Sequence, residues 1–159
     1  MPFTDVLKAA AYRAAAVEYL KRWLFTPYRW GGDDPLAGID CSGLVIEILK
    51  AVGLWGEKED DVAGGILERF KANVVFRPYA GVMVFFKKPD GSIPHVGMMI
   101  DETFMIHAAS GDQTTIDLES AVKANAYVKM RELESYARLR KTLYNQTVVF
   151  ADPFKVPTS

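Results

Sequence analysis

Hydrophobic residues recur at helical spacing near the start of the chain. Four of them share one helical face: Val6, Ala10, Val17 and Leu24. Thr4 precedes this stripe and belongs to a residue type that caps helices. The alanine-rich stretch between them has strong helix propensity. We therefore predict a helix from Thr4 to about Leu24.

A second apolar stripe follows a segment, Thr26–Ile39, whose glycines and prolines predict a shaped loop. The stripe contains Cys41, Val45, Ile48, Leu49 and Val52, with Glu47 and Lys50 on the opposite side. Asp40 before it is a good N-cap, and Gly53 after it is a good C-cap. A helix therefore starts at Cys41. Asp61–Ala72 predicts a weaker helix, because Gly64 and Gly65 lower its propensity.

From Gly81 onward the pattern changes to short apolar runs that are typical of strands. An antiparallel meander is predicted over Val82–Lys87, His95–Ile100 and Phe104–Ala108. Further along we expect a helical turn at Asp117–Asn125, a strand at Tyr127–Arg131, helix or irregular chain at Glu132–Tyr144 and a strand at Thr147–Ala151. Helices first and strands second indicate an α+β fold. The 159 residues, 50% of them hydrophobic, fit one domain spanning 1–159.

Charge and hydropathy exclude several classes of protein. The 19 Lys and Arg residues against 20 Asp and Glu give a net charge of -1, which is not the signature of a dedicated nucleic-acid binder. No apolar run approaches the roughly 20 residues of a membrane-spanning helix. Asp5, Lys8, Arg13 and Glu18 interrupt the stretch where a secretory signal would lie. We therefore expect synthesis in the cytoplasm without a signal peptide.

Cys41 is the only cysteine, so it forms no intramolecular disulfide and any chemistry it performs involves no second thiol. It lies in the first turn of the predicted second helix, where backbone N–H groups and the helix dipole lower the pKa of a thiol. That position predicts a nucleophile. The alternative is a small buried hydrophobe on an apolar helix face.

The two histidines, His95 and His107, both fall inside the predicted meander. A three-residue loop at Ile100–Glu102 places His95 directly opposite His107, whereas a two-residue loop at Asp101–Glu102 sends His107 to the other face. Asp-Glu lacks the glycine or asparagine that tight hairpins prefer, so we expect the longer loop. One histidine then accepts the thiol proton and the other orients it.

Three stretches with this order and spacing resemble the signature of the NlpC/P60 cysteine peptidases. They are Pro27-Tyr28-Arg29-Trp30-Gly31-Gly32, Asp40-Cys41-Ser42-Gly43-Leu44-Val45, and His95-Val96-Gly97-Met98-Met99-Ile100 followed by Ile106-His107-Ala108. The resemblance implies a papain-like α+β fold with N-terminal helices packed on a central antiparallel sheet. It also implies hydrolysis of bacterial cell-wall stem peptides, commonly between D-glutamate and a diamino acid.

The resemblance also implies residue roles. Cys41 is then the nucleophile, His95 the general base and His107 the orienting third member, with no metal or organic cofactor. Tyr28 assists the oxyanion hole, and its alternative role is a packed aromatic. The remaining matched residues are Asp40 and Ser42, which in some members hold the free amino end of the peptide, and Trp30, which either shapes the loop or contacts the substrate. Members often carry Gly-Asp-Leu-Val where this chain has Gly81-Val82-Met83-Val84.

Several other readings remain open from the sequence alone. An amidase or acyltransferase of the same fold uses the same thiol. Cys41, His95 and His107 also supply three potential zinc ligands with an open fourth position. A non-catalytic wall-binding or phage-tail domain retains the fold without the chemistry. A phage or prophage hydrolase, or a secreted effector, would act on the wall without a signal peptide.

Overall fold

The computed structural model describes residues 3–34 and 36–157; Pro35, in the predicted loop, lies outside them. Within these residues a six-stranded antiparallel sheet runs in the order β3-β8-β4-β5-β6-β7. Its strands are β3 (Val74–Val75), β4 (Met83–Lys87), β5 (His95–Met99), β6 (Phe104–Ala109), β7 (Tyr127–Glu132) and β8 (Thr147–Ala151). The helices are α1 (Val6–Lys21), α2 (Cys41–Ala51), α3 (Ala63–Arg69), the 3-10 turn η1 (Lys71–Asn73), α4 (Leu118–Ala124) and α5 (Leu133–Tyr144). The α+β prediction is confirmed.

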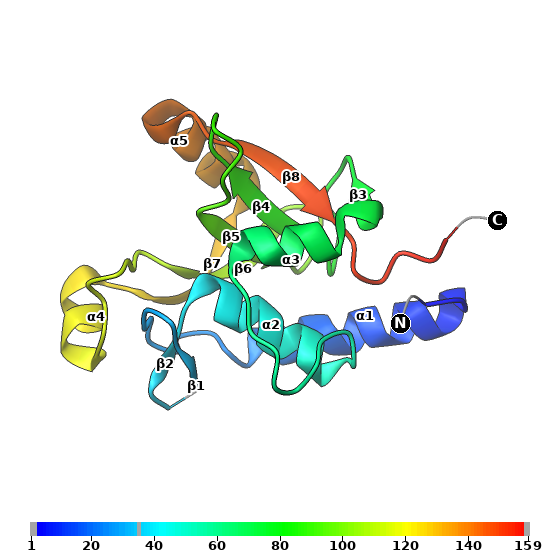
Figure 1. The fold of residues 1–159 in the computed structure, drawn as a ribbon, viewed down its shortest axis with the longest axis horizontal. Helices are drawn as coiled ribbons and strands as arrows, with labels where there is room; N and C mark the ends of the chain where they lie inside the picture. The colour runs from blue at the N-terminus through cyan, green and yellow to red at the C-terminus, as the bar shows by residue number, and fades with distance from the viewer. Residues whose placement is uncertain (1–2, 35, 158–159) are drawn as a thin grey trace.

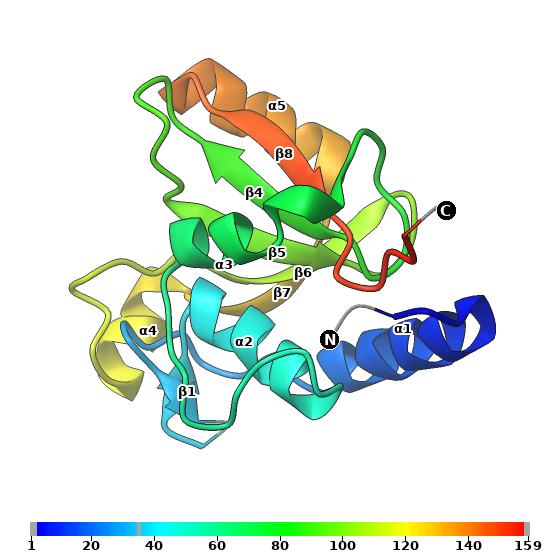
Figure 2. The ribbon, with the colours of Figure 1, turned by 45° about the vertical axis from the view of Figure 1, so that its right-hand side comes forward.

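The two faces of the sheet carry separate apolar layers. Alternate strand residues such as Phe85, Val96 and Met98 pack with α1, α2 and α3 in the larger core. Phe86 and Met99 point the opposite way and pack under α5. Figures 1 and 2 show α1 and α2 on one side of the sheet and α5 on the other. The predicted helices therefore cover one face, and α5 adds a layer on the second.

The meander is confirmed, but its predicted register is wrong by two residues. Met98 pairs with Ile106 and Met99 with Met105, so His107 lies opposite Gly97 rather than His95. The Ile100 N–H donates to the Phe104 carbonyl oxygen at 2.9 Å, so the connecting loop covers residues 101–103, one residue further along than expected. The Asp101 carboxylate holds this loop by accepting hydrogen bonds from the N–H groups of Thr103 and Phe104. A shift of two leaves both histidines on the same face, since side chains alternate with a period of two.

Element boundaries differ from the predictions in a few places. Asp5 rather than Thr4 caps α1, because its carboxylate accepts the N–H of Lys8. Gly53 follows α2 with a φ of 75°, as a C-terminal glycine should. The Thr26–Ile39 loop contains the short hairpin β1 (Asp33–Asp34) and β2 (Gly38–Ile39), and the two-residue β3 was not expected. None of the described helices is long and apolar enough to cross a membrane.

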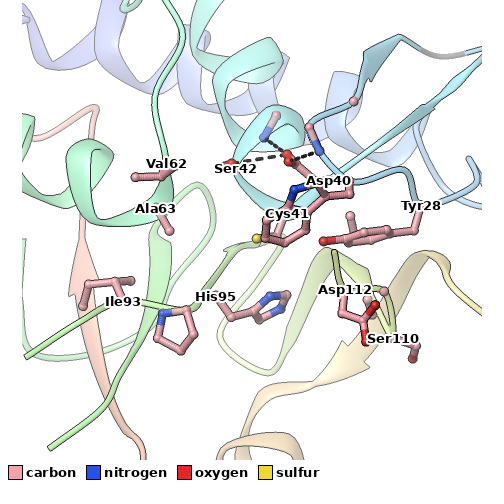
Figure 3. A pocket seen from close by; sticks show the side chains of 18 of the residues that line it. Tyr28, Asp40, Cys41, Ser42, Val62, Ala63, Ile93, His95, Ser110 and Asp112 are labelled. Carbon is pink, nitrogen blue, oxygen red and sulfur yellow. Dashed lines mark hydrogen bonds between the residues drawn. The ribbon is translucent and has the colours of Figure 1, made fainter. Parts of the chain in front are cut away.

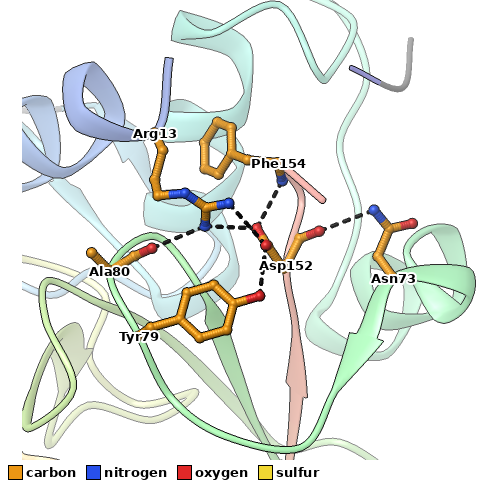
Figure 4. A network of polar contacts seen from close by, with 6 residues as sticks. All are labelled: Arg13, Asn73, Tyr79, Ala80, Asp152 and Phe154. Atoms are coloured by element: carbon orange, nitrogen blue, oxygen red, sulfur yellow. Dashed lines mark hydrogen bonds and ion pairs between the residues drawn. The ribbon is translucent and has the colours of Figure 1, made fainter. Parts of the chain in front are cut away.

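A buried ion pair joins the two ends of the chain (Figure 4). The two terminal guanidinium nitrogens of Arg13 on α1 each donate to the Asp152 carboxylate at 2.9 Å. The same carboxylate accepts from the Tyr79 hydroxyl at 2.8 Å and from the Phe154 N–H at 2.9 Å. Asp152 is 2% exposed, so these donors replace the water it lost. The cluster fixes α1 against the segment that follows β8.

Removing the Arg13 side chain should leave the Asp152 charge buried without its main partner. We expect Arg13→Ala to lower the free energy of unfolding by about 3 kcal/mol. Arg138→Ala, which removes an exposed ion pair with Glu134 at 3.1 Å, should cost less than about 0.5 kcal/mol. Urea denaturation of both variants measures this, and equal losses would contradict the role given to the cluster.

Candidate active site

The Asp40 carboxylate organises the N-terminus of α2. One oxygen accepts the Gly43 N–H at 2.7 Å and the Ser42 hydroxyl at 3.2 Å, and the other accepts the Gly31 N–H at 2.9 Å. Asp40 is therefore the N-cap, as predicted, and it also ties the preceding loop to the helix (Figure 3). Partial burial raises the pKa of its carboxyl, and these hydrogen bonds oppose that shift.

Glycines allow the loop to approach the helix this closely. A Cβ placed on Gly43 would collide with the carbonyl oxygen of Gly32 and lie 2.8 Å from the Asp40 carboxylate. A Cβ on Gly32 would collide with the carbonyl oxygen of Gly38. The backbone of the loop thus packs directly against the first turn of α2. Cys41 is held in a fixed place as a result.

The two histidines meet as a hydrogen-bonded pair. His95 Nε2 lies 2.6 Å from His107 Nδ1. His107 is completely buried, and its Cβ would be 3.1 Å from a Cβ on Gly97, the residue opposite it. Glycine at that position gives the His107 side chain room to lean toward His95. Because these two nitrogens face each other, they cannot serve as ligands of one metal ion, which disfavours the zinc reading.

Cys41 and His95 converge from opposite faces of the sheet. Cys41 is the first residue of α2, and His95 is the first residue of β5. Both line one cleft of about 860 Å³, together with Tyr28 (Figure 3). The backbone N–H groups of Val96, Ser42 and Cys41 act to lower the pKa of the thiol, which favours its ionised form. The structure therefore brings together Cys41, His95 and His107, the three residues predicted to carry the chemistry.

The expected depression of the thiol pKa is not found. Burial raises the pKa of Cys41 to about 11, and the neighbouring Asp40 charge acts in the same direction. Burial also lowers the pKa of His95 to about 3, and it lowers the pKa of His107 well below its usual value. For the Cys41 thiol, the loss of hydrating water raises the pKa by more than the helix dipole lowers it. The resting pair consists of a neutral thiol and a neutral imidazole.

Tyr28 packs at the opposite side of Cys41 and is only 4% exposed. Its ring lies against Gly111, where any Cβ would collide with it. Burial is the main reason that the pKa of its hydroxyl is raised, so it stays protonated and can donate a hydrogen bond. Ser42 and Trp30 also line the cleft, the serine nearly buried and the indole half exposed.

One wall of the cleft was not identified from the sequence. It is built by α5 residues that recur at helical spacing: Tyr136, Leu139, Arg140, Leu143 and Tyr144. Arg131 on β7 extends this wall. The spacing was visible as an amphipathic stripe, but nothing in the sequence indicated which side of the sheet the helix covers.

The depressed histidine pKa predicts a dependence of stability on pH. A histidine in the unfolded chain titrates near 6.5, whereas His95 in the fold titrates at about 3. Its contribution to stability is therefore present above pH 6.5 and is lost as the pH falls toward 3. Between pH 6 and 4, His95→Gln should reduce the slope of unfolding free energy against pH by about 1.4 kcal/mol per unit. Identical slopes in urea titrations would contradict this.

The close contact between Gly111 and Tyr28 predicts an effect on stability, which can be measured without an assay of activity. Gly111→Ala should displace the Tyr28 ring and lower the free energy of unfolding by about 1–3 kcal/mol. Gly64→Ala is the matched control, because a Cβ there meets nothing closer than 4.0 Å and α3 gains about 1 kcal/mol of helix propensity. In thermal denaturation, the midpoint temperature should fall for Gly111→Ala and rise for Gly64→Ala. A stable Gly111→Ala protein would mean that the tyrosine is loosely held.

Comparisons with known proteins agree with this geometry. The NlpC/P60 family model matches residues 25–132. A Lysinibacillus sphaericus protein described as dipeptidyl-peptidase 6 is 33% identical over 105 residues, covering 64% of this chain and 34% of that protein. The chain thus spans about a third of the length of that relative.

Solved structures share the fold at low sequence identity. The NlpC/P60 domain of the peptidoglycan hydrolase SagA superposes with a TM-score of 0.57 at 20% identity, covering 87% of this chain and 97% of that one. The P60 domain of a Mycobacterium avium subspecies paratuberculosis antigen gives 0.57 at 22% identity, with 91% and 98% covered. The Mycobacterium tuberculosis peptidoglycan hydrolase RipB gives 0.56 at 20% identity, with 98% and 75% covered. With the family model matching more than half of its length, the chain belongs to the NlpC/P60 family.

Proposed function

We propose that this protein is a cysteine peptidase that hydrolyses peptidoglycan stem peptides with Cys41, His95 and His107. The observation that carries the proposal is the placement of a helix-start thiol and a hydrogen-bonded histidine pair at one cleft. Membership of the NlpC/P60 family supports it. The names of SagA and RipB as peptidoglycan hydrolases support the substrate class.

The proposed role of His95 as the base implies one arrangement of protons in the histidine pair. For His95 Nδ1 to accept the thiol proton, its Nε2 must carry a hydrogen and donate it to His107 Nδ1. His107 then carries its proton on Nε2, the buried side-chain polar atom that has no hydrogen-bond partner in residues 3–34 and 36–157. His107 in this way fixes the tautomer and the ring orientation of His95.

Acyl transfer follows from this arrangement. Because both groups are neutral at rest, the proton passes from Cys41 to His95 as the sulfur attacks the peptide carbonyl carbon. The carbonyl oxygen becomes an oxyanion, which the Cys41 backbone N–H and the Tyr28 hydroxyl stabilise. His95 returns the proton to the departing amine as the C–N bond breaks. Water, deprotonated by His95, then attacks the thioester, and the thiol is restored when the C–S bond breaks.

The cleft suits a short peptide with a free amino end. The Asp40 carboxylate and the Ser42 hydroxyl lie beside Cys41, so an ammonium group bound there places the next residue's carbonyl near the sulfur. Trp30 borders the same region. We propose that the bond cleaved joins D-glutamate to the diamino acid of the stem peptide. No metal or organic cofactor enters the reaction.

Digestion of diaminopimelate-type peptidoglycan by the wild type and by Cys41→Ala tests the proposal. The wild type should release peptides cut at the D-glutamyl bond, identified by mass spectrometry. Cys41→Ala should lose at least about a thousandfold in rate. Transfer products in place of hydrolysis products would instead identify an acyltransferase, and inactivity of the wild type on sacculi and on free stem peptides would contradict the proposal.

A further inference from the structure

The cleft has opposite charges on its two sides. Asp40 lies on the side of the α2 N-terminus, where the proposed amino end binds. The wall formed by β7 and α5 carries Arg131 and Arg140 instead. The Tyr136 ring centre lies 6.1 Å from that of His95 and 4.8 Å from that of His107. The guanidinium carbons of Arg131 and Arg140 lie 5.3 Å and 5.8 Å from the same Tyr136 ring centre, so the basic wall adjoins the histidine pair. The negative charge of Asp40 and the positive charges of the two arginines therefore lie at different sides of the cleft.

The Arg140 side chain is held in position by neighbours that leave most of its donors unused. Its Nε donates to the Gln146 side-chain oxygen at 2.7 Å, and Gln146 is only 4% exposed. The guanidinium carbon lies 4.9 Å from the ring centre of Tyr144 and 5.8 Å from that of Tyr136. Such a clamp fixes the plane of the guanidinium while its two terminal nitrogens remain available.

The positive charge on this wall is not neutralised by the protein. Within residues 3–34 and 36–157, no carboxylate lies within 4.0 Å of the guanidinium of Arg131 or Arg140. Arg138, on the same helix, differs from these two arginines, because it forms an ion pair with Glu134 on the exposed side. A fixed guanidinium without an acidic partner at the edge of a cleft is a ready receptor for a carboxylate.

The position of the wall indicates which part of the substrate it contacts. His95 must give its proton to the departing amine, so the leaving group lies on the histidine side of Cys41. We propose that Arg140, assisted by Arg131, binds a carboxylate of the leaving diamino acid. This inference rests on the proposed function. Together with Asp40 it makes the site selective for a peptide that is positive at one end and negative at the other.

Four peptides test the inference with the full chain. Each contains L-Ala-γ-D-Glu followed by meso-diaminopimelate, by diaminopimelate amidated at its distal carboxyl, by L-Lys, or by L-Lys amide. The wild type should cleave the meso-diaminopimelate peptide, which carries both carboxylates, about 10- to 100-fold faster in kcat/KM than the L-Lys amide peptide, and most of the difference should lie in KM. The diaminopimelate pair shows whether the distal carboxylate or the α-carboxylate is recognised.

Variants of α5 assign the preference to Arg140. In Arg140→Gln the ratio between carboxylate and carboxamide peptides should fall toward 1, and Arg140→Lys should restore part of it. Arg138→Gln removes the same charge from the exposed side of the helix and should keep the wild-type ratio. An equal drop in both glutamine variants would mean that only net charge matters and would overturn the inference.

The two proposals fail in distinguishable ways. If the wild type cleaves none of the four peptides and no sacculi, the proposed function is wrong. If the wild type cleaves all four peptides at similar rates, the proposed peptidase function stands and the proposed carboxylate site is wrong.

Discussion

The Asp40 carboxylate is the contact on which the site depends. It caps α2 and at the same time accepts the N–H of Gly31 from the loop, so one side chain determines both where the helix starts and where the loop lies. Cys41 is the next residue, and the loop carries Tyr28 and Trp30. A displacement of the Asp40 carboxylate would therefore move the Cys41 thiol together with Tyr28 and Trp30 of the loop.

The second constraint is the exclusion of water around the catalytic groups. Burial favours the neutral forms of Cys41, His95 and His107 at once, which opposes an ion pair at rest. The guanidinium groups of Arg140 on α5 and Arg131 on β7 add to this by disfavouring a charged imidazole. A bound substrate carboxylate would offset that positive charge. Binding at Arg140 would then make His95 a better base at the moment it is needed.

Much of the fold could be predicted from periodicity. The Asp40 cap, the stripe of α2 and the alternation of the meander are local signals, and they located Cys41 on a helix start and both histidines in adjacent strands. The register of that strand pair was predicted wrongly, with His95 directly opposite His107, because nothing in the sequence showed where the Asp101 turn places the loop. The prediction that both histidines lie on the same face of the sheet was nonetheless correct, because a register shift of two residues leaves each side chain on its original face.

The electrostatics and the α5 wall could not be predicted for a different reason. The pKa of Cys41 depends on how much protein surrounds it, and the helix dipole that the sequence reveals is only one contribution. The stripe of α5 from Tyr136 to Tyr144 is readable as a helix face. Its contribution to the cleft depends on the sheet order, with β8 returning beside β4, which is a long-range pairing without a local signal.

The pH dependence of Cys41 alkylation tests the account most directly. Cys41 is the only cysteine, so each iodoacetamide adduct seen in the intact mass reports this thiol. A neutral resting pair with a thiol pKa of about 11 predicts a rate that rises about tenfold per pH unit from pH 6 to 9. A rate already high at pH 6 and constant up to pH 8 would show a thiolate–imidazolium pair and would contradict the account.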